Sequence, residues 1–138
     1  MEKAAFNFKG YHFKKAIIDF PTGNDFYDLQ IAFNPSGVFD TQNSLYKLLL
    51  EIVVLTGEEN NEHPIVDVTC EAEFQFSQKI EFNDIPGFFY PNSIAILFPY
   101  IRAFVSTLTL QANVTPIVLP TLNLTNLTVL SFPFILEK

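Results

Sequence analysis

The side chains best suited to chemistry are two histidines, one cysteine and a few acidic residues. His12 stands between Tyr11 and Phe13 in a strand-like segment, and His63 ends the acidic loop 57–63. No His-x-x-x-His pair, Gly-x-Ser-x-Gly elbow or glycine-rich phosphate loop accompanies them. We therefore interpret both histidines as solvated, with a catalytic base as the minority alternative for His12. We predict no enzyme and no cofactor.

The acidic loop and the cysteine predict no metal site. Glu58, Glu59 and Glu62 could gather a cation, but their spacing specifies no coordination pattern. Cys70 is the only cysteine, which excludes an internal disulfide and a cysteine-based zinc cluster. It falls on the apolar side of a strand pattern, so we interpret it as a small core residue.

Composition favours a single globular domain over residues 1–138. The chain is 49% hydrophobic with a net charge of −7, and an acidic surface argues against nucleic acid as the main partner. The first residues lack the apolar core of a signal peptide, and Arg102 interrupts the longest apolar run. We expect a cytoplasmic protein without membrane insertion. The sixteen phenylalanines are suited to a core or to a surface that holds apolar material.

Four strand patterns precede a helix. In the first, Gly10 marks a bulge, after which Tyr11, Phe13 and Ile17 are expected on one common face. The second covers 27–33, and Asn-Pro-Ser-Gly at 34–37 predicts the turn that ends it.

The third and fourth patterns predict the centre of a sheet. Residues 45–56 are apolar on both faces except for Lys47 and Glu51, and residues 66–76 alternate strictly. No connection is long enough for a helical crossover, so we predict an α+β fold with a four-stranded antiparallel sheet and a C-terminal helix on one face. The apolar second face of the third strand predicts cover by another subunit, hence an oligomer.

The segment 94–112 predicts the helix. Its polar residues at 102, 106, 109 and 113 form one stripe, with Arg102 in a structural role. Asn92 or Ser93 could cap the helix. Pro99 predicts a kink or a late start near Phe98. The chain end, 125–138, is predicted to be short, extended or irregular.

Two motifs resemble the SecB family of protein-export chaperones. Leu-Phe-Pro-Tyr-x-Arg runs from Leu97 to Arg102, and Pro-x-Leu-Asn-Leu runs from Pro120 to Leu124. Leu119 replaces the phenylalanine that precedes the second motif in the family. The resemblance implies a four-stranded antiparallel sheet, a packed helical layer and a dimer of dimers.

The resemblance also implies two binding surfaces. A client groove is expected to use the triplet before the helix and the loop after it: Phe88, Phe89, Tyr90, Ile117, Val118, Leu119, Leu122 and Leu124. The family docks the translocation motor SecA on an acidic sheet face, for which Asp19, Ile65 and Asp67 are the matching residues. Lys15 stands where the family has an acidic residue, and we expect no acidic tail of the kind that the family carries.

These observations predict an ATP-independent holdase that binds unfolded polypeptide in an apolar groove for protein export. Burial of apolar client surface would drive binding, at about 25 cal/mol per Å². One alternative is a SecB-like chaperone devoted to a single client such as an antitoxin. Another, from a different class, is a carrier of a small apolar ligand or lipid.

Overall fold

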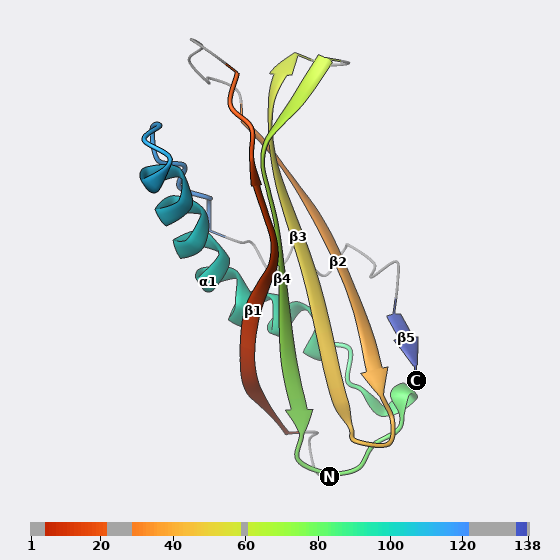
Figure 1. Ribbon diagram of the computed structural model, residues 1–138. Coiled ribbons are helices and arrows are strands. Elements are labelled where there is room, and N and C mark those ends of the chain that lie inside the picture. Colours follow the sequence, from red (N-terminus) through yellow and green to blue (C-terminus); the bar gives the residue numbers. More distant parts are fainter. Residues whose placement is uncertain (1–4, 22–28, 59–60, 122–134, 138) are drawn as a thin grey trace.

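The computed structural model describes residues 5–21, 29–58, 61–121 and 135–137 (Figure 1). Its elements are β1 (Phe6–Ile18), β2 (Gln30–Asp40), β3 (Leu45–Glu58), β4 (Asn61–Phe76), the 3-10 turn η1 (Phe82–Asp84), α1 (Phe89–Gln111) and β5 (Ile135–Glu137). The sheet order is β1-β4-β3-β2-β5, with β1 to β4 antiparallel and β5 parallel to β2. One face of this sheet is covered by α1 (Figure 1). The predicted α+β architecture is confirmed.

The central hairpin β3–β4 follows its sequence pattern. Within residues 45–54 and 66–76, even-numbered residues point to α1 and are buried, for example Leu48 opposite Ala72 and Leu50 opposite Cys70; beyond them the register shifts between Val54 and Leu55, and Ile65 is buried beside Val66. Odd-numbered residues form the opposite surface, which we call the open face, and it includes Glu51 and Asp67. The strict alternation of β4 therefore placed its side chains correctly.

β1 contains two register shifts, of which the sequence predicted one. The first lies between Phe8 and Gly10, where the glycine has a φ of 141°. The second lies between Phe13 and Lys15. Each extra residue in a bulge reverses the side-chain alternation. Ile17 therefore pairs with Asp67 on the open face, and its predicted place beside Phe13 was wrong.

The predicted turn at 34–37 was also wrong, because β2 runs straight through it. Pro35 pairs with Leu50, at a point where, among the described residues, no strand pairs with the outer side of β2. Proline is tolerated there because no partner needs its missing N–H. Gly37 is a packing requirement, since a Cβ at this position would collide with the phenol of Tyr46.

α1 begins five residues earlier than predicted, at Phe89, and continues through Pro99. The predicted late start was wrong, and no side chain caps the first turn: Ser93 Oγ instead donates to the Tyr90 carbonyl at 2.8 Å. Pro91 lies in the first turn, where a backbone N–H has no helical partner.

The inner surface of α1 is part of the core. Leu97, Ile101 and Val105 are fully buried. By length and composition alone α1 could cross a membrane, with a mean hydropathy of 1.5, but a helix that packs on a sheet meets the same criteria. Of the chain end, only Ile135–Glu137 lies within the described residues, and it is extended as predicted.

Candidate functional site

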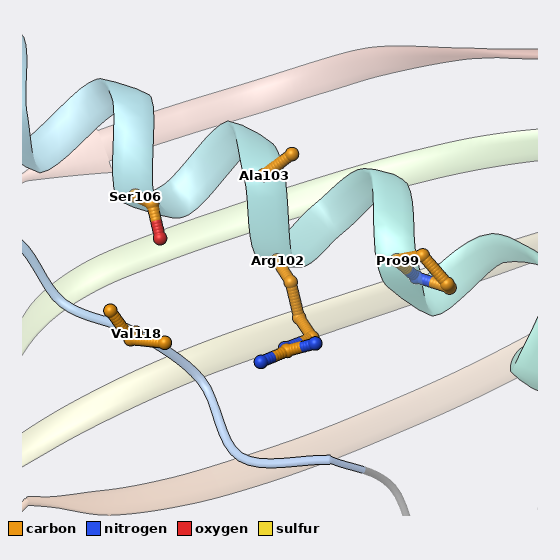
Figure 2. Close-up of a pocket in the computed structure, with 5 residues that line it drawn as sticks. All are labelled: Pro99, Arg102, Ala103, Ser106 and Val118. Atoms are coloured by element: carbon orange, nitrogen blue, oxygen red, sulfur yellow. The ribbon is translucent and has the colours of Figure 1, made fainter.

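A surface pocket of about 240 Å³ lies between α1 and the segment that returns along it, residues 114–121 (Figure 2). Pro99, Arg102, Ala103 and Ser106 line it from the helix, and Val118 lines it from the segment. Figure 2 shows Arg102 and Ser106 projecting from α1 toward this segment.

Three hydrogen bonds fix the returning segment to the helix. Arg102 Nε donates to the Leu119 carbonyl at 2.8 Å, and Ser106 Oγ donates to the Ile117 carbonyl at 2.9 Å. Thr109 Oγ1 accepts a bond of 2.9 Å from the Ile117 N–H. The polar stripe of the sequence is therefore the seam that holds the segment. Arg102 begins this stripe and bonds a backbone carbonyl, not the carboxylate that a structural ion pair would require.

The turn into this segment uses Asn113. Its φ of 63° is left-handed, a conformation that asparagine tolerates better than most residues. The Val114 N–H donates back to the Thr109 carbonyl at 3.3 Å. The helix thus ends with an asparagine that reverses the chain direction.

The predicted groove residues divide into exposed and buried sets. Val118 is 70% exposed and Phe88 is 49% exposed, whereas Tyr90 is half-buried. The side chains of Phe89, Ile117 and Leu119 belong to the core, so in this structure they present no surface to a client. Alternation along the extended segment explains this, because residues 117 and 119 point inward when 118 points outward. Leu122 and Leu124 lie outside the described residues.

The structure adds an apolar surface that the sequence analysis missed. Tyr11 and Tyr100 are each 41% exposed, and their rings lie 4.5 Å apart. Beside them Phe13 stacks on Phe104 at 3.9 Å, and Phe8 lies 5.8 Å from Tyr100. We call these five residues the aromatic strip. The sequence indicated only that Tyr11 and Phe13 lie on the same face of β1. Their contacts with Tyr100 and Phe104 depend on how α1 crosses β1, which the sequence pattern does not reveal.

The open face has a network of charges at its centre. Lys15 Nζ lies 2.8 Å from Glu51 Oε2 and 3.1 Å from Asp67 Oδ2, and Asn34 donates to Glu51 Oε1 at 3.1 Å. The hydrogen bond from Lys15 lowers the pKa of Glu51. The pKa of Asp67 is raised, mainly by burial and secondly by its hydrogen bond with Glu51. Hydrogen bonds to both carboxylates raise the pKa of Lys15.

The three residues predicted for motor docking lie close together, beside the end of β1. The Asp19 N–H donates to the Ile65 carbonyl at 2.9 Å, and Asp67 is two residues along β4. The Asp19 side chain is 68% exposed, but Ile65 is fully buried and cannot contact a partner directly. Asp67 is bound to Lys15. Only Asp19 of the three is therefore both exposed and acidic without a lysine partner among the described residues.

The remaining candidates for chemistry form no metal centre. Within the described ranges, no group of three or more His, Cys, Asp or Glu residues could hold a metal ion. His12 Nε2 lies 3.3 Å from Glu71, and His63 Nε2 lies 3.1 Å from the Asp19 carbonyl. Burial raises the pKa of the Cys70 thiol to about 12, which makes it a poor nucleophile.

Comparison with sequences gives limited information. No family model matches the chain. An uncharacterized protein, MJ0357 of Methanocaldococcus jannaschii, is 36% identical over 77 residues, which are 54% of this chain and 50% of that protein. The chain thus spans about half the length of the curated relative that it matches.

Comparison with solved structures identifies the fold. The SecB-like chaperone Rv1957 of Mycobacterium tuberculosis, solved in complex with a ChAD peptide from the HigA1 antitoxin Rv1956, matches with a TM-score of 0.69. The two are 14% identical, and the match covers 86% of this chain and 88% of that chain. A protein of unknown function from Streptococcus agalactiae matches over 86% of this chain and 99% of that chain, with a TM-score of 0.49 and 8% identity. The chain therefore has the fold of a SecB-like chaperone.

Proposed function

We propose that this protein is an ATP-independent chaperone that holds unfolded polypeptide on the apolar surface around α1. The observation that carries this proposal is the shared fold with a SecB-like chaperone that was solved with a bound peptide. The two motifs from Leu97 to Arg102 and from Pro120 to Leu124 support the same assignment.

The physical basis is exposed apolar area beside α1. Val118 and Phe88 are exposed on the segments that follow and precede the helix, and the aromatic strip lies between α1 and β1. An unfolded client offers apolar side chains, and burying each Å² of them contributes about 25 cal/mol. Aromatic surfaces also accept varied partners, because any apolar side chain can pack on a ring face. Such a surface binds without strong sequence preference.

The client surface needs no nucleotide for binding. The sequence contains no glycine-rich phosphate loop, and a solved structure of the same fold is a chaperone, not an enzyme. Release would follow from client folding or from a competing partner. We place this activity in the cytoplasm.

We further propose a homo-oligomer, with a dimer of dimers as the expected form. β1 is the outermost strand, and no strand in the described parts of the chain pairs with its outer side. Leu49 and Val53 are apolar and only partly buried on the open face. An unpaired strand edge and uncovered aliphatic residues are both suited to contact with another subunit.

A dedicated chaperone of a single client is the second candidate. In the SecB family the acidic sheet face receives SecA, and here Lys15 neutralises the centre of that face by binding Glu51 and Asp67. The solved structure with the same fold contains an antitoxin peptide, which supports a narrow client range. A role in general protein export would require an exposed acidic surface that binds SecA. Among the predicted residues, Asp19 is the strongest candidate to contribute to such a surface.

Aggregation suppression tests the proposal. Chemically unfolded proteins are diluted into buffer without nucleotide, and light scattering is followed as this protein is added, with an acidic protein of similar size as the control. We expect scattering to fall at about one oligomer per client. Protection restricted to one protein, such as a product of a neighbouring gene, would favour the dedicated chaperone. Unchanged aggregation of every client tried would contradict the proposal and direct attention to a carrier of small apolar ligands.

A further inference from the structure

The helical layer of the protein holds a single charge. From Ile85 to Leu136, Arg102 is the only charged residue, and it is the only arginine of the chain. All fifteen Asp and Glu residues lie before this stretch or directly after it. The helical part of the surface proposed for client binding is therefore neutral except for one guanidinium group.

Within the described residues, the Arg102 guanidinium is only partly satisfied. Its Nε donates to the Leu119 carbonyl at 2.8 Å, which leaves the four N–H bonds of the two Nη groups. Among the described residues, no carboxylate forms an ion pair with it. The sequence that follows, 122–134, contains no Asp or Glu that could supply one.

We propose that Arg102 binds the carboxylate of an Asp or Glu side chain in the client. This inference rests on the proposed chaperone function and adds a chemical preference to it. The two Nη groups can donate two parallel N–H···O bonds, one to each oxygen of the carboxylate. Because Nε is already bonded to the Leu119 carbonyl, the carboxylate is expected to bind at the two Nη groups. The preferred client segment has an acidic residue beside an apolar one.

The pocket supplies contacts for both parts of such a segment. Arg102 lines it together with Pro99 and the exposed side chain of Val118 (Figure 2). An apolar client residue would pack on Pro99 and Val118 while its acidic neighbour reaches the guanidinium. The pocket lies along the surface between α1 and the returning segment, so a continuous client chain can pass across it.

The location of Arg102 in a stretch without acidic residues also favours binding of an anion there, even though the protein as a whole is acidic. The acidic residues that flank the neutral stretch in sequence are Asp84 before it and Glu137 after it. Distant surface charges are screened beyond about 8 Å at physiological salt. The partly buried guanidinium is screened less, so its attraction for a carboxylate in contact exceeds the repulsion from the rest of the chain.

Paired peptides test this preference. Two aliphatic-rich peptides, acetylated and amidated at their ends, differ only in a central Glu or Gln, and their affinities for the full chain are measured by fluorescence anisotropy. We expect the Glu peptide to bind about five- to tenfold more tightly, with a ratio that falls as salt is added. In Arg102→Gln the ratio should fall to about one, and Arg102→Lys, which keeps charge without the fork, should be intermediate.

Ser106→Ala is the matched control. It removes the neighbouring bond to the Ile117 carbonyl, which loosens the segment but keeps the guanidinium, so the Glu/Gln ratio should stay as in the original chain. Equal binding of the two peptides would overturn the inference and leave the chaperone proposal intact. A Gln peptide with a free C-terminal carboxylate that binds as well as the Glu peptide would overturn the assignment to side chains. Failure of all peptides, together with failed aggregation suppression, would overturn both proposals.

Discussion

The two outer surfaces of this protein use charge in opposite ways. On the open face, Lys15 is bound to two carboxylates and Lys14 lies 3.9 Å from Glu71. In the helical layer, from residue 85 to 121, there is one charge, Arg102, and among the described residues it contacts a backbone carbonyl instead of a carboxylate. The open face satisfies most of its own charges, whereas the surface around α1 leaves hydrogen-bond donors and apolar side chains available to a partner.

This difference supports the proposal that clients bind to the surface around α1 and not to the open face. Exposed ion pairs contribute little to stability, commonly less than about 1 kcal/mol each, but they oppose nonspecific association of a sheet face. Exposed aromatic and aliphatic side chains have the reverse effect. We therefore assign client binding to the surface around α1, and the predictions below separate that surface from the open face.

The largest expected effect comes from breaking the contact between the two layers. Leu97→Ala should lower the free energy of unfolding by about 3 kcal/mol, because it opens a cavity under a fully buried side chain. Denaturant titration measures the change. Leu110→Ala is the control on the same helix, since Leu110 is 60% exposed and its loss should cost less than about 0.5 kcal/mol. Equal losses in the two variants would mean that α1 does not pack as described.

A smaller effect is expected when only the helical layer is loosened. Thr109→Val keeps the shape of a buried side chain but leaves the Ile117 N–H without its acceptor, at a cost of about 1–2 kcal/mol. Hydrogen exchange at the Ile117 amide should become roughly tenfold faster. Thr107→Val, at an exposed position of the same helix, should change neither quantity. Unchanged exchange in Thr109→Val would show that the seam does not hold the segment.

The smallest effect is expected on the open face and depends on pH. Without Lys15, Glu51 loses the hydrogen bond that lowers its pKa, and Asp67 keeps the burial that raises its own. Both folded-state pKa values are then higher than in the original chain, so as pH rises the ionisation of either group favours folding less, or opposes it more, than it does with Lys15 in place. Lys15→Met should be less stable than the original chain by about 1 kcal/mol at pH 7, and the deficit should disappear below about pH 4.

The control for this prediction is Lys14→Met. Its ammonium is half exposed and 3.9 Å from Glu71, so its removal should cost less than about 0.5 kcal/mol with little dependence on pH. A deficit in Lys15→Met that is constant from pH 4 to pH 7 would contradict the proposed coupling among the three charges.

Local patterns in the sequence predicted the elements whose alternation is uninterrupted. Residues 66–76 of β4 alternate strictly, and the polar stripe of α1 faces the segment that it binds. Errors arose where a neighbouring strand overrides a local signal. Pro35 and Gly37 indicate a turn, but an edge position tolerates the proline and the Tyr46 ring requires the glycine.

Site residues were harder to predict than elements, because they depend on contacts between distant segments. The network of Lys15, Glu51 and Asp67 requires a bulge in β1 and the register of β1 and β3 with β4. The ring contact of Tyr11 with Tyr100 requires the crossing of α1 over β1. Neither is visible in the spacing of residues along the chain.

The assignment of client binding to the surface around α1 is tested most directly by a matched pair of substitutions. Val118 is 70% exposed beside α1, and Ile17 is 51% exposed on the open face, so replacing either by Asn should leave stability nearly unchanged. Aggregation suppression is then measured for both variants. We predict a loss of about threefold or more in client affinity for Val118→Asn and no loss for Ile17→Asn, because only the first removes apolar area from the binding surface. A loss confined to Ile17→Asn would contradict the account and assign client binding to the open face.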